Sequence, residues 1–205
     1  KPADFKIDSY DLEFNFRNDL NAVATIKTDD VKDEYKFTLY HGYKISKITD
    51  GNNDELDFTR DSDYFTIKNT SKSKLIKIYY HGSCDKYYSN SLSVFLPGNF
   101  AFYPIPGFNE MYSTHSYAGF DNLSLPYETD FNVTVHSLKK VQCNLESSTN
   151  NEFKGKSDSL TLLSGFINCV TINKTQIYYP YFNDAYNSDT INEKLETFVS
   201  KNPNI

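Results

Sequence analysis

The chain has 205 residues, of which 39% are hydrophobic and 23% are charged, and its formal net charge is −6 at pH 7. This length suits one sizeable core or at most two small ones, and no run approaches the roughly 18 to 20 apolar residues of a membrane-spanning helix. Because only two of the 21 basic residues are Arg, the charge gives no electrostatic footprint for nucleic acid or for an anionic lipid surface.

Aromatic residues dominate the apolar content, with 16 Phe, 17 Tyr and no Trp. Phe and Tyr favour the half-buried, pleated surface of a strand, and apolar residues alternate with polar ones along most of the chain. The first expected strand, residues 10–16, places Tyr10, Leu12 and Phe14 on one face. Further strands are expected at residues 22–26, 35–39, 43–48, 56–58, 65–67, 76–80, 131–135, 141–143, 160–167 and 175–182. Strands at a spacing of about ten residues predict an all-β fold, a β-sandwich of twisted, saddle-like sheets.

The segment between residues 95 and 120 breaks this alternation. Pro97-Gly98 and Pro106-Gly107 stand where a type II turn takes Pro and then Gly. Aromatic side chains on irregular backbone are common at interfaces, because they supply contact area at a low cost in entropy. The candidate binding residues are Phe100, Phe102, Tyr103, Phe108 and Tyr112. The alternative is that these side chains fill one end of the sandwich as part of its core.

One segment near the C-terminal end is predicted to be a helix. Its apolar stripe consists of Ile191, Leu195, Phe198 and Val199. Thr190 and Glu193 match a capping box at the start of the stripe. We therefore expect a β-sandwich domain over residues 1–188 and a helix over residues 189–205 that leads into a missing downstream domain.

The residue patterns of common catalytic and metal sites are absent from the sequence. Zinc hydrolysis needs ligands on a rigid element, as in H-E-x-x-H. The His residues are scattered instead, at His41, His81, His115 and His136. The chain also lacks a G-x-S-x-G nucleophile elbow and a Gly-rich phosphate loop. We expect no catalytic residue, no metal site and no cofactor.

Three smaller patterns have a structural interpretation. The tripeptide Tyr-His-Gly occurs at residues 40–42 and 80–82, as expected where two strands end in Gly turns; paired metal ligation by its two His is the alternative. The D-x-N-x-D spacing of residues 50–54 opens calcium loops, but the Gly that such a loop needs is missing, which favours an acidic hairpin turn. The three Cys are too few and too separated for a disulfide scaffold, which favours free thiols; a single disulfide is the alternative, with Cys143–Cys169 as its pair.

The order of strands and loops carries a family resemblance. The segments that carry it are the strand pair 10–16 and 22–27, Ile78-Tyr79-Tyr80-His81-Gly82, the Pro-rich loop 95–110, Thr129-Asp130-Phe131-Asn132-Val133-Thr134-Val135, and Phe153-Lys154-Gly155-Lys156 followed by 160–166. Over residues 7–182 the chain is similar to the N-terminal β-domain of the aminopeptidase N family of zinc metallopeptidases. The resemblance carries over no catalytic residue, because the family's zinc motif and its G-x-M-E-N motif belong to the next domain. The loop lacks the Arg and the Pro-Cys-x-Asp-Glu-Pro-like stretch of that family.

The sequence F-L-P-G-N-F-A-F-Y-P-I-P-G of residues 95–107 resembles that of a narrower group of proteins. It is similar to the exported, aminopeptidase-like segment of ABC-type permeases in low-GC Gram-positive bacteria. This implies a non-catalytic domain on the extracellular face of the bacterial membrane, whose partners are other domains of its parent protein and a peptide or protein ligand. One alternative is a substrate-positioning domain of a zinc aminopeptidase, and another is an adhesion or scaffold module. In all three cases the chain alone is not an enzyme.

Overall fold

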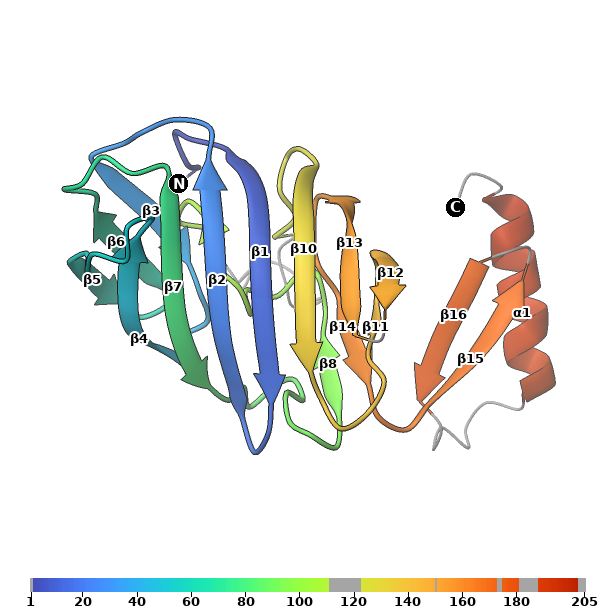
Figure 1. Ribbon diagram of the computed structural model, residues 1–205. Coiled ribbons are helices and arrows are strands. Elements are labelled where there is room, and N and C mark those ends of the chain that lie inside the picture. The colour runs from blue at the N-terminus through green and yellow to red at the C-terminus, as the bar shows by residue number, and fades with distance from the viewer. Residues whose placement is uncertain (1, 111–122, 150, 173–174, 181–187, 203–205) are drawn as a thin grey trace. The chain divides into compact units, whose positions relative to one another are not determined.

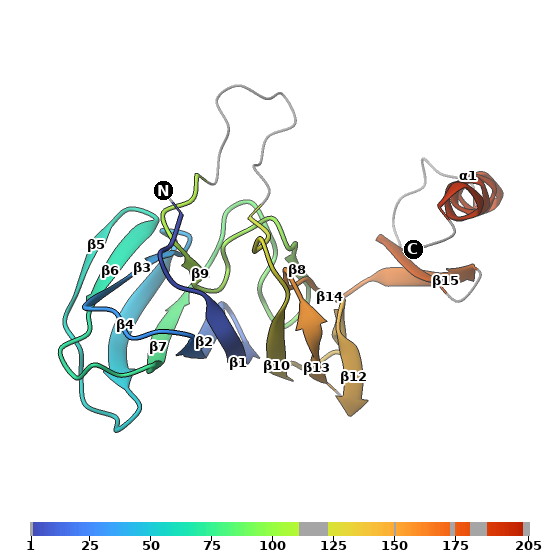
Figure 2. The ribbon, with the colours of Figure 1, turned by 90° about the horizontal axis from the view of Figure 1, so that it is seen from above.

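The computed structural model describes residues 2–110, 123–149, 151–172, 175–180 and 188–202. The chain divides into two compact units, Lys1–Ser164 and Gly165–Ile205. Figure 1 shows the strands and the helix of both units, and Figure 2 adds the label of β9. Each unit is described by itself.

A seven-stranded sheet forms the first layer of unit Lys1–Ser164. Its strands, from edge to edge, are β12 (Glu146–Thr149), β13 (Glu152–Ser157), β10 (Thr129–His136), β1 (Ile7–Phe16), β2 (Leu20–Thr28), β7 (Leu75–Gly82) and β4 (Tyr43–Asp50). The central pair β1 and β10 is parallel, whereas the neighbouring pairs are antiparallel. The sheet is therefore mixed.

Two smaller sheets lie behind the large one. One consists of β5 (Phe58–Asp61), β6 (Tyr64–Lys68), β3 (Glu34–Thr38) and β9 (Ile105–Pro106), and the other of β11 (Gln142–Cys143), β14 (Leu162–Ser164) and β8 (Val94–Leu96). Seen from the front and from above, the four-stranded sheet lies behind β7 and β4, and the three-stranded sheet lies behind β10 and β13 (Figures 1 and 2). This layered all-β arrangement confirms the predicted fold class.

The alternating sequence pattern explains which face of each strand is buried. On β1, Tyr10, Leu12 and Phe14 are at most 1% exposed, whereas the intervening Asp11 and Glu13 point to solvent. Strands β2, β7 and β10 show the same alternation. Since side chains on a strand alternate between its faces, one face of the large sheet enters the core and the other stays polar.

The predicted strand at residues 160–167 is interrupted in the structure. Strand β14 ends at Ser164 and β15 (Ile167–Ile172) begins after Gly165, whose φ of 120° breaks the extended backbone. The hairpin of β15 and β16 (Thr175–Pro180) consequently belongs to the second unit together with the helix. The boundary between the two compact units falls at Ser164, inside the predicted strand.

The predicted helix is present as α1 (Ser188–Lys201). It begins two residues before Thr190, so Thr190 lies inside the first turn and is not its cap. In this stripe Val199 is buried, and Phe198 is 53% exposed. Among the described residues, no helix is long and apolar enough to cross a membrane.

Candidate functional site

The aromatic segment that the sequence marks as a contact surface lies largely in the core. Phe100, Phe102 and Tyr103 are 1%, 0% and 1% exposed. The Phe102 ring centroid is 5.7 Å from that of Phe14, and the Tyr103 ring centroid is 5.4 Å from that of Tyr10. These three side chains are therefore not accessible to a partner in this structure. They belong to the core, as in the alternative interpretation that they fill one end of the sandwich.

Hydrogen bonds from neighbouring strands hold this segment in place. The Tyr10 hydroxyl donates to the Pro104 carbonyl at 2.8 Å, and the Tyr80 hydroxyl donates to the Phe102 carbonyl at 2.9 Å. Burial raises the pKa of both tyrosines well above the ordinary value, and nearby tyrosines raise it further. The hydroxyls therefore remain protonated donors. They supply hydrogen bonds to the carbonyls of Phe102 and Pro104, which lie outside the regular strands.

The two predicted Pro-Gly turns have different outcomes. Gly107 has φ of 89°, as the third residue of a type II turn requires. Gly98 is not among the glycines with positive φ, and the amide of Phe100 donates to the carbonyl of Pro97 at 3.0 Å. That bond places the first turn one residue later than predicted.

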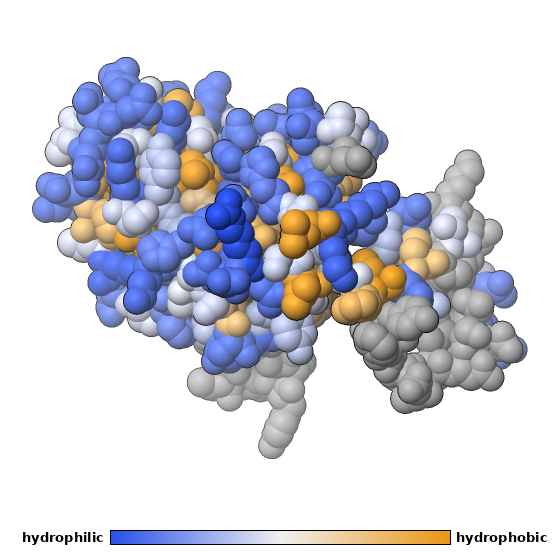
Figure 3. All heavy atoms as spheres, turned by 60° about the horizontal axis from the view of Figure 1, so that its bottom comes forward, coloured by the Kyte–Doolittle hydropathy of each residue, from blue (hydrophilic) through white to orange (hydrophobic). Residues whose placement is uncertain are grey.

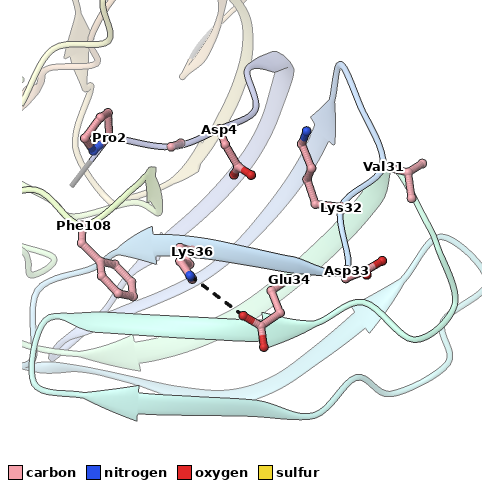
Figure 4. Close-up of a pocket in the computed structure, with 9 residues that line it drawn as sticks. Pro2, Asp4, Val31, Lys32, Asp33, Glu34, Lys36 and Phe108 are labelled. Atoms are coloured by element: carbon pink, nitrogen blue, oxygen red, sulfur yellow. Dashed lines mark ion pairs between the residues drawn. The ribbon is translucent and has the colours of Figure 1, made fainter.

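Phe108 is the one predicted binding residue, among those described, that is not fully buried. Tyr112 lies outside the described residues. Phe108 borders a groove of about 660 Å³, and its ring centroid is 5.0 Å from that of Tyr64. Figure 4 shows the side chains around this groove. The other residues that line it are Pro2, Ala3, Asp4, Val31, Lys32, Asp33, Glu34 and Lys36.

The groove beside Phe108 carries charges of both signs. Lys36 Nζ lies 4.0 Å from Glu34 Oε2, and Lys32 Nζ lies 2.9 Å from Oδ2 of Asp30. The hydrogen bond with Lys32 lowers the pKa of Asp30. The described residues that line the groove include no hydroxyl or thiol, so this set can hold charged or polar groups by ion pairing but supplies no such nucleophile. Sequence analysis missed these residues, because a few charges at a strand start carry no specific signal.

The two Tyr-His-Gly tripeptides meet through their glycines. A Cβ on Gly82 would lie 2.1 Å from the carbonyl oxygen of Gly42, and Gly82 has φ of 144°. A side chain at this position would therefore clash with the facing backbone. The two His residues have different partners. His41 Nδ1 is 2.8 Å from Asp63 Oδ1, whereas His81 lies opposite Lys44 in the pairing of β7 with β4.

The zinc motif that the family resemblance places in a neighbouring domain has no counterpart in this sequence. Among the described residues there is no group of three or more His, Cys, Asp or Glu that could hold a metal ion. The acidic D-x-N-x-D pattern is a turn, since Oδ1 of Asp50 accepts the amides of Asn52 at 2.8 Å and Asp54 at 3.0 Å.

Cys143, one member of the possible disulfide pair, lies against the core of unit Lys1–Ser164. Cys143 is a free, partly buried thiol. Burial raises its pKa to about 11, so it stays protonated at neutral pH. Its sulfur accepts a hydrogen bond from the amide of Leu145 at 3.5 Å. The role of this Cys is therefore to pack against the core.

No family model matches the chain, and no curated protein matches it. Solved structures do resemble it. An aminopeptidase N family protein from Idiomarina loihiensis has a TM-score of 0.60 at 11% identity and covers 93% of this chain and 36% of its own. Yeast LTA4 hydrolase in complex with bestatin has a TM-score of 0.61 at 15% identity, with coverages of 97% and 34%. An M1 zinc metallopeptidase from Deinococcus radiodurans has a TM-score of 0.52 at 9% identity, with coverages of 97% and 54%.

At these identities the likeness shows the fold alone. The chain spans between 34% and 54% of the length of the three solved chains, while nearly all of it is matched. The fold of this chain is therefore that of the N-terminal β-domain of M1 aminopeptidase N family proteins.

Proposed function

We propose that the chain is a non-catalytic domain of a larger protein of M1 metallopeptidase fold, where it supports a zinc-containing domain and helps to position a peptide substrate. The observation that carries this proposal is the coverage: the match takes in 93% to 97% of this chain but only 34% to 54% of three metallopeptidase-related chains. The sequence itself contains no H-E-x-x-H.

The groove beside Phe108 is the surface that we assign to substrate or domain contact. Its neighbouring Lys and acidic side chains match the two charged ends of a peptide or of a facing protein loop. Phe108 follows directly on the segment that Tyr10 and Tyr80 hold by hydrogen bonds, and these bonds fix the backbone that carries its ring to the groove.

The test is to sequence the gene that encodes this chain, including the regions before and after the part that encodes residues 1–205. An H-E-x-x-H motif and a later Glu after residue 205 support the proposal. The longer protein should then hydrolyse aminopeptidase substrates, whereas the 205-residue chain should not. Activity of the purified chain alone would overturn the proposal.

A second candidate rests on the loop of residues 95–107, which departs from the peptidase pattern and is similar to the permease segment. It is an extracellular domain of a bacterial ABC-type permease that binds other domains of its parent protein and a peptide or protein ligand. The gene then encodes runs of about 20 apolar residues on either side of this chain and no H-E-x-x-H. A soluble continuation carrying that motif excludes this candidate.

A further inference from the structure

The large exposed apolar side chains of unit Lys1–Ser164 lie in the segment before β8, in β8 itself and in the segment after β10. Among its described residues they are Tyr88 (65% exposed), Leu92 (65%), Phe95 (43%) and Leu138 (86%). We call these four residues the apolar patch. Isolated exposed apolar residues are ordinary on protein surfaces, whereas a concentration of them marks an interaction site.

Backbone contacts bring the two segments together. The amide of Phe95 donates to the carbonyl of Tyr88 at 2.8 Å, which closes a tight hairpin with Leu92 near its tip. The amide of Ser91 donates to the carbonyl of Arg17 at 2.7 Å, and Ser91, Arg17 and Leu138 line one shallow groove of about 610 Å³. The β1–β2 turn, the segment before β8 and the segment after β10 accordingly lie at the same edge in Figure 1.

Basic side chains lie in the same connectors as the residues of the apolar patch. Lys139 and Lys140 follow Leu138, Lys86 precedes Tyr88 in the sequence, and Arg17 lies beside Ser91. The space-filling view of this edge shows hydrophobic atoms beside strongly hydrophilic ones (Figure 3). Two carboxylates lie in the same connectors: Asp19 accepts from Asn21, and Asp85 accepts from the Tyr40 hydroxyl. The cations outnumber these acids, although the whole chain carries a charge of −6.

We infer that the apolar patch docks on an anionic lipid surface. Leu92 and Leu138 are 65% and 86% exposed on their connectors, with Leu138 lining the shallow groove, and such exposed side chains suit insertion into a soft phase. Tyr88 has the amphipathic ring that concentrates at the level of lipid headgroups. The Lys and Arg side chains place positive charge at the same level, where anionic headgroups attract it.

Charge averaged over the chain hides this local excess of cations. The composition gives no footprint for an anionic lipid surface, because the net charge of −6 sums over every residue of the chain. The inference does not depend on which larger protein contains the chain, since it uses only the side chains of one edge.

The test is flotation of the 205-residue chain with vesicles of phosphatidylcholine and phosphatidylserine, compared with vesicles of phosphatidylcholine alone. We expect binding to the mixed vesicles that falls as salt is added. The double variant Leu92→Ser/Leu138→Ser should lower the partition coefficient by about tenfold or more, because it removes the two apolar side chains that insert into the bilayer. Phe198→Ser, at a residue 53% exposed in the second unit, is the matched control and should bind as the wild type does.

Charge variants provide a second, independent readout. Arg17→Gln/Lys140→Gln should weaken binding to the mixed vesicles and leave the urea midpoint unchanged, because both side chains are exposed. Absence of wild-type binding to mixed vesicles, or equal binding of the Leu double variant, would overturn the inference. Equal binding to both vesicle types would also overturn it. A wild-type dimer in sedimentation that the Leu double variant abolishes would assign the patch to a second copy of the chain instead.

Discussion

Two irregular, apolar segments of the first unit have opposite environments. Within residues 97–107 the stretch 100–107, with Phe100 and Phe102, is buried, whereas residues 88–95 hold the exposed side chains of Tyr88 and Leu92. Both segments lack long strands and both are rich in large apolar residues. Composition and irregularity therefore do not tell a core segment from a contact surface.

The backbone partners explain the difference. The buried segment has donors on three sides, from Tyr10, Tyr80 and the amide of Tyr40, which donates to the Ala101 carbonyl at 2.9 Å. The exposed hairpin closes mainly on itself: the amide of Leu92 donates to Oδ1 of Asn90 at 3.0 Å. An irregular segment can be buried only where other elements satisfy its backbone. The following predictions test this comparison.

Truncation of a buried aromatic should have the largest effect. Phe102→Ala should lower the free energy of unfolding by about 3–5 kcal/mol, because it removes a fully buried ring that packs on Phe14. Urea denaturation measures the change. Phe95→Ala, at a residue 43% exposed, is the control and should cost much less. If both substitutions cost the same, the two segments do not differ as described.

Removal of a single hydroxyl should have the next largest effect. Tyr80→Phe leaves the carbonyl of Phe102 buried without its donor at 2.9 Å, so we expect a loss of about 1–3 kcal/mol. The matched control is Tyr79→Phe, which lies next to it in β7 and is only partly buried. A change within about 0.5 kcal/mol is expected for the control. Equal urea midpoints for the two variants would contradict the bonding scheme.

Raising the pH should destabilise the fold through Cys143. Its pKa is about 11 in the folded chain and near the ordinary 9.0 when unfolded, so between these values the unfolded state binds fewer protons. Stability from this group is present below pH 9 and is lost as the pH rises towards 11, by about 1 kcal/mol at pH 10. Urea midpoints at pH 8 and pH 10 measure this, with Cys143→Ala as the reference. The same pH slope in wild type and variant would contradict the prediction.

Substitution in the apolar patch should have the smallest effect on stability. Leu138→Ser should change the free energy of unfolding by less than about 0.5 kcal/mol, because the side chain is 86% exposed. The same urea titration gives this value. A loss comparable to that of Phe102→Ala would show that Leu138 packs against the fold and is not available for contact.

Strand positions follow from the sequence wherever alternation is regular. In β1 and β10 each predicted inward residue is buried. Side chains alternate between the two faces of a strand, so one residue in the core places every second residue there as well. The break at Gly165 was missed, since the apolar run of residues 160–167 gives no sign of a positive φ. The helix start was also misplaced, because Thr190 matched a capping pattern inside the first turn.

The candidate site could be predicted only in part. The aromatic segment stands out in the sequence, but its burial depends on hydroxyl donors that lie 94 and 22 residues away in the chain. No local pattern carries that information. The groove beside Phe108 joins residues 2–4 with residues 31–36, and the apolar patch joins two connectors with the β1–β2 turn. Such surfaces are products of the sheet topology.

Amide hydrogen exchange of the unmodified chain compares the two segments most directly. The amide of Gly107 donates to the Lys36 carbonyl at 2.8 Å, and that of Tyr40 donates to Ala101 at 2.9 Å. Both should exchange only through global unfolding, whereas the amide of Leu92 should exchange at least about 100-fold faster. Exchange of Gly107 and Tyr40 as fast as that of Leu92 would contradict the assignment of residues 97–107 to the core.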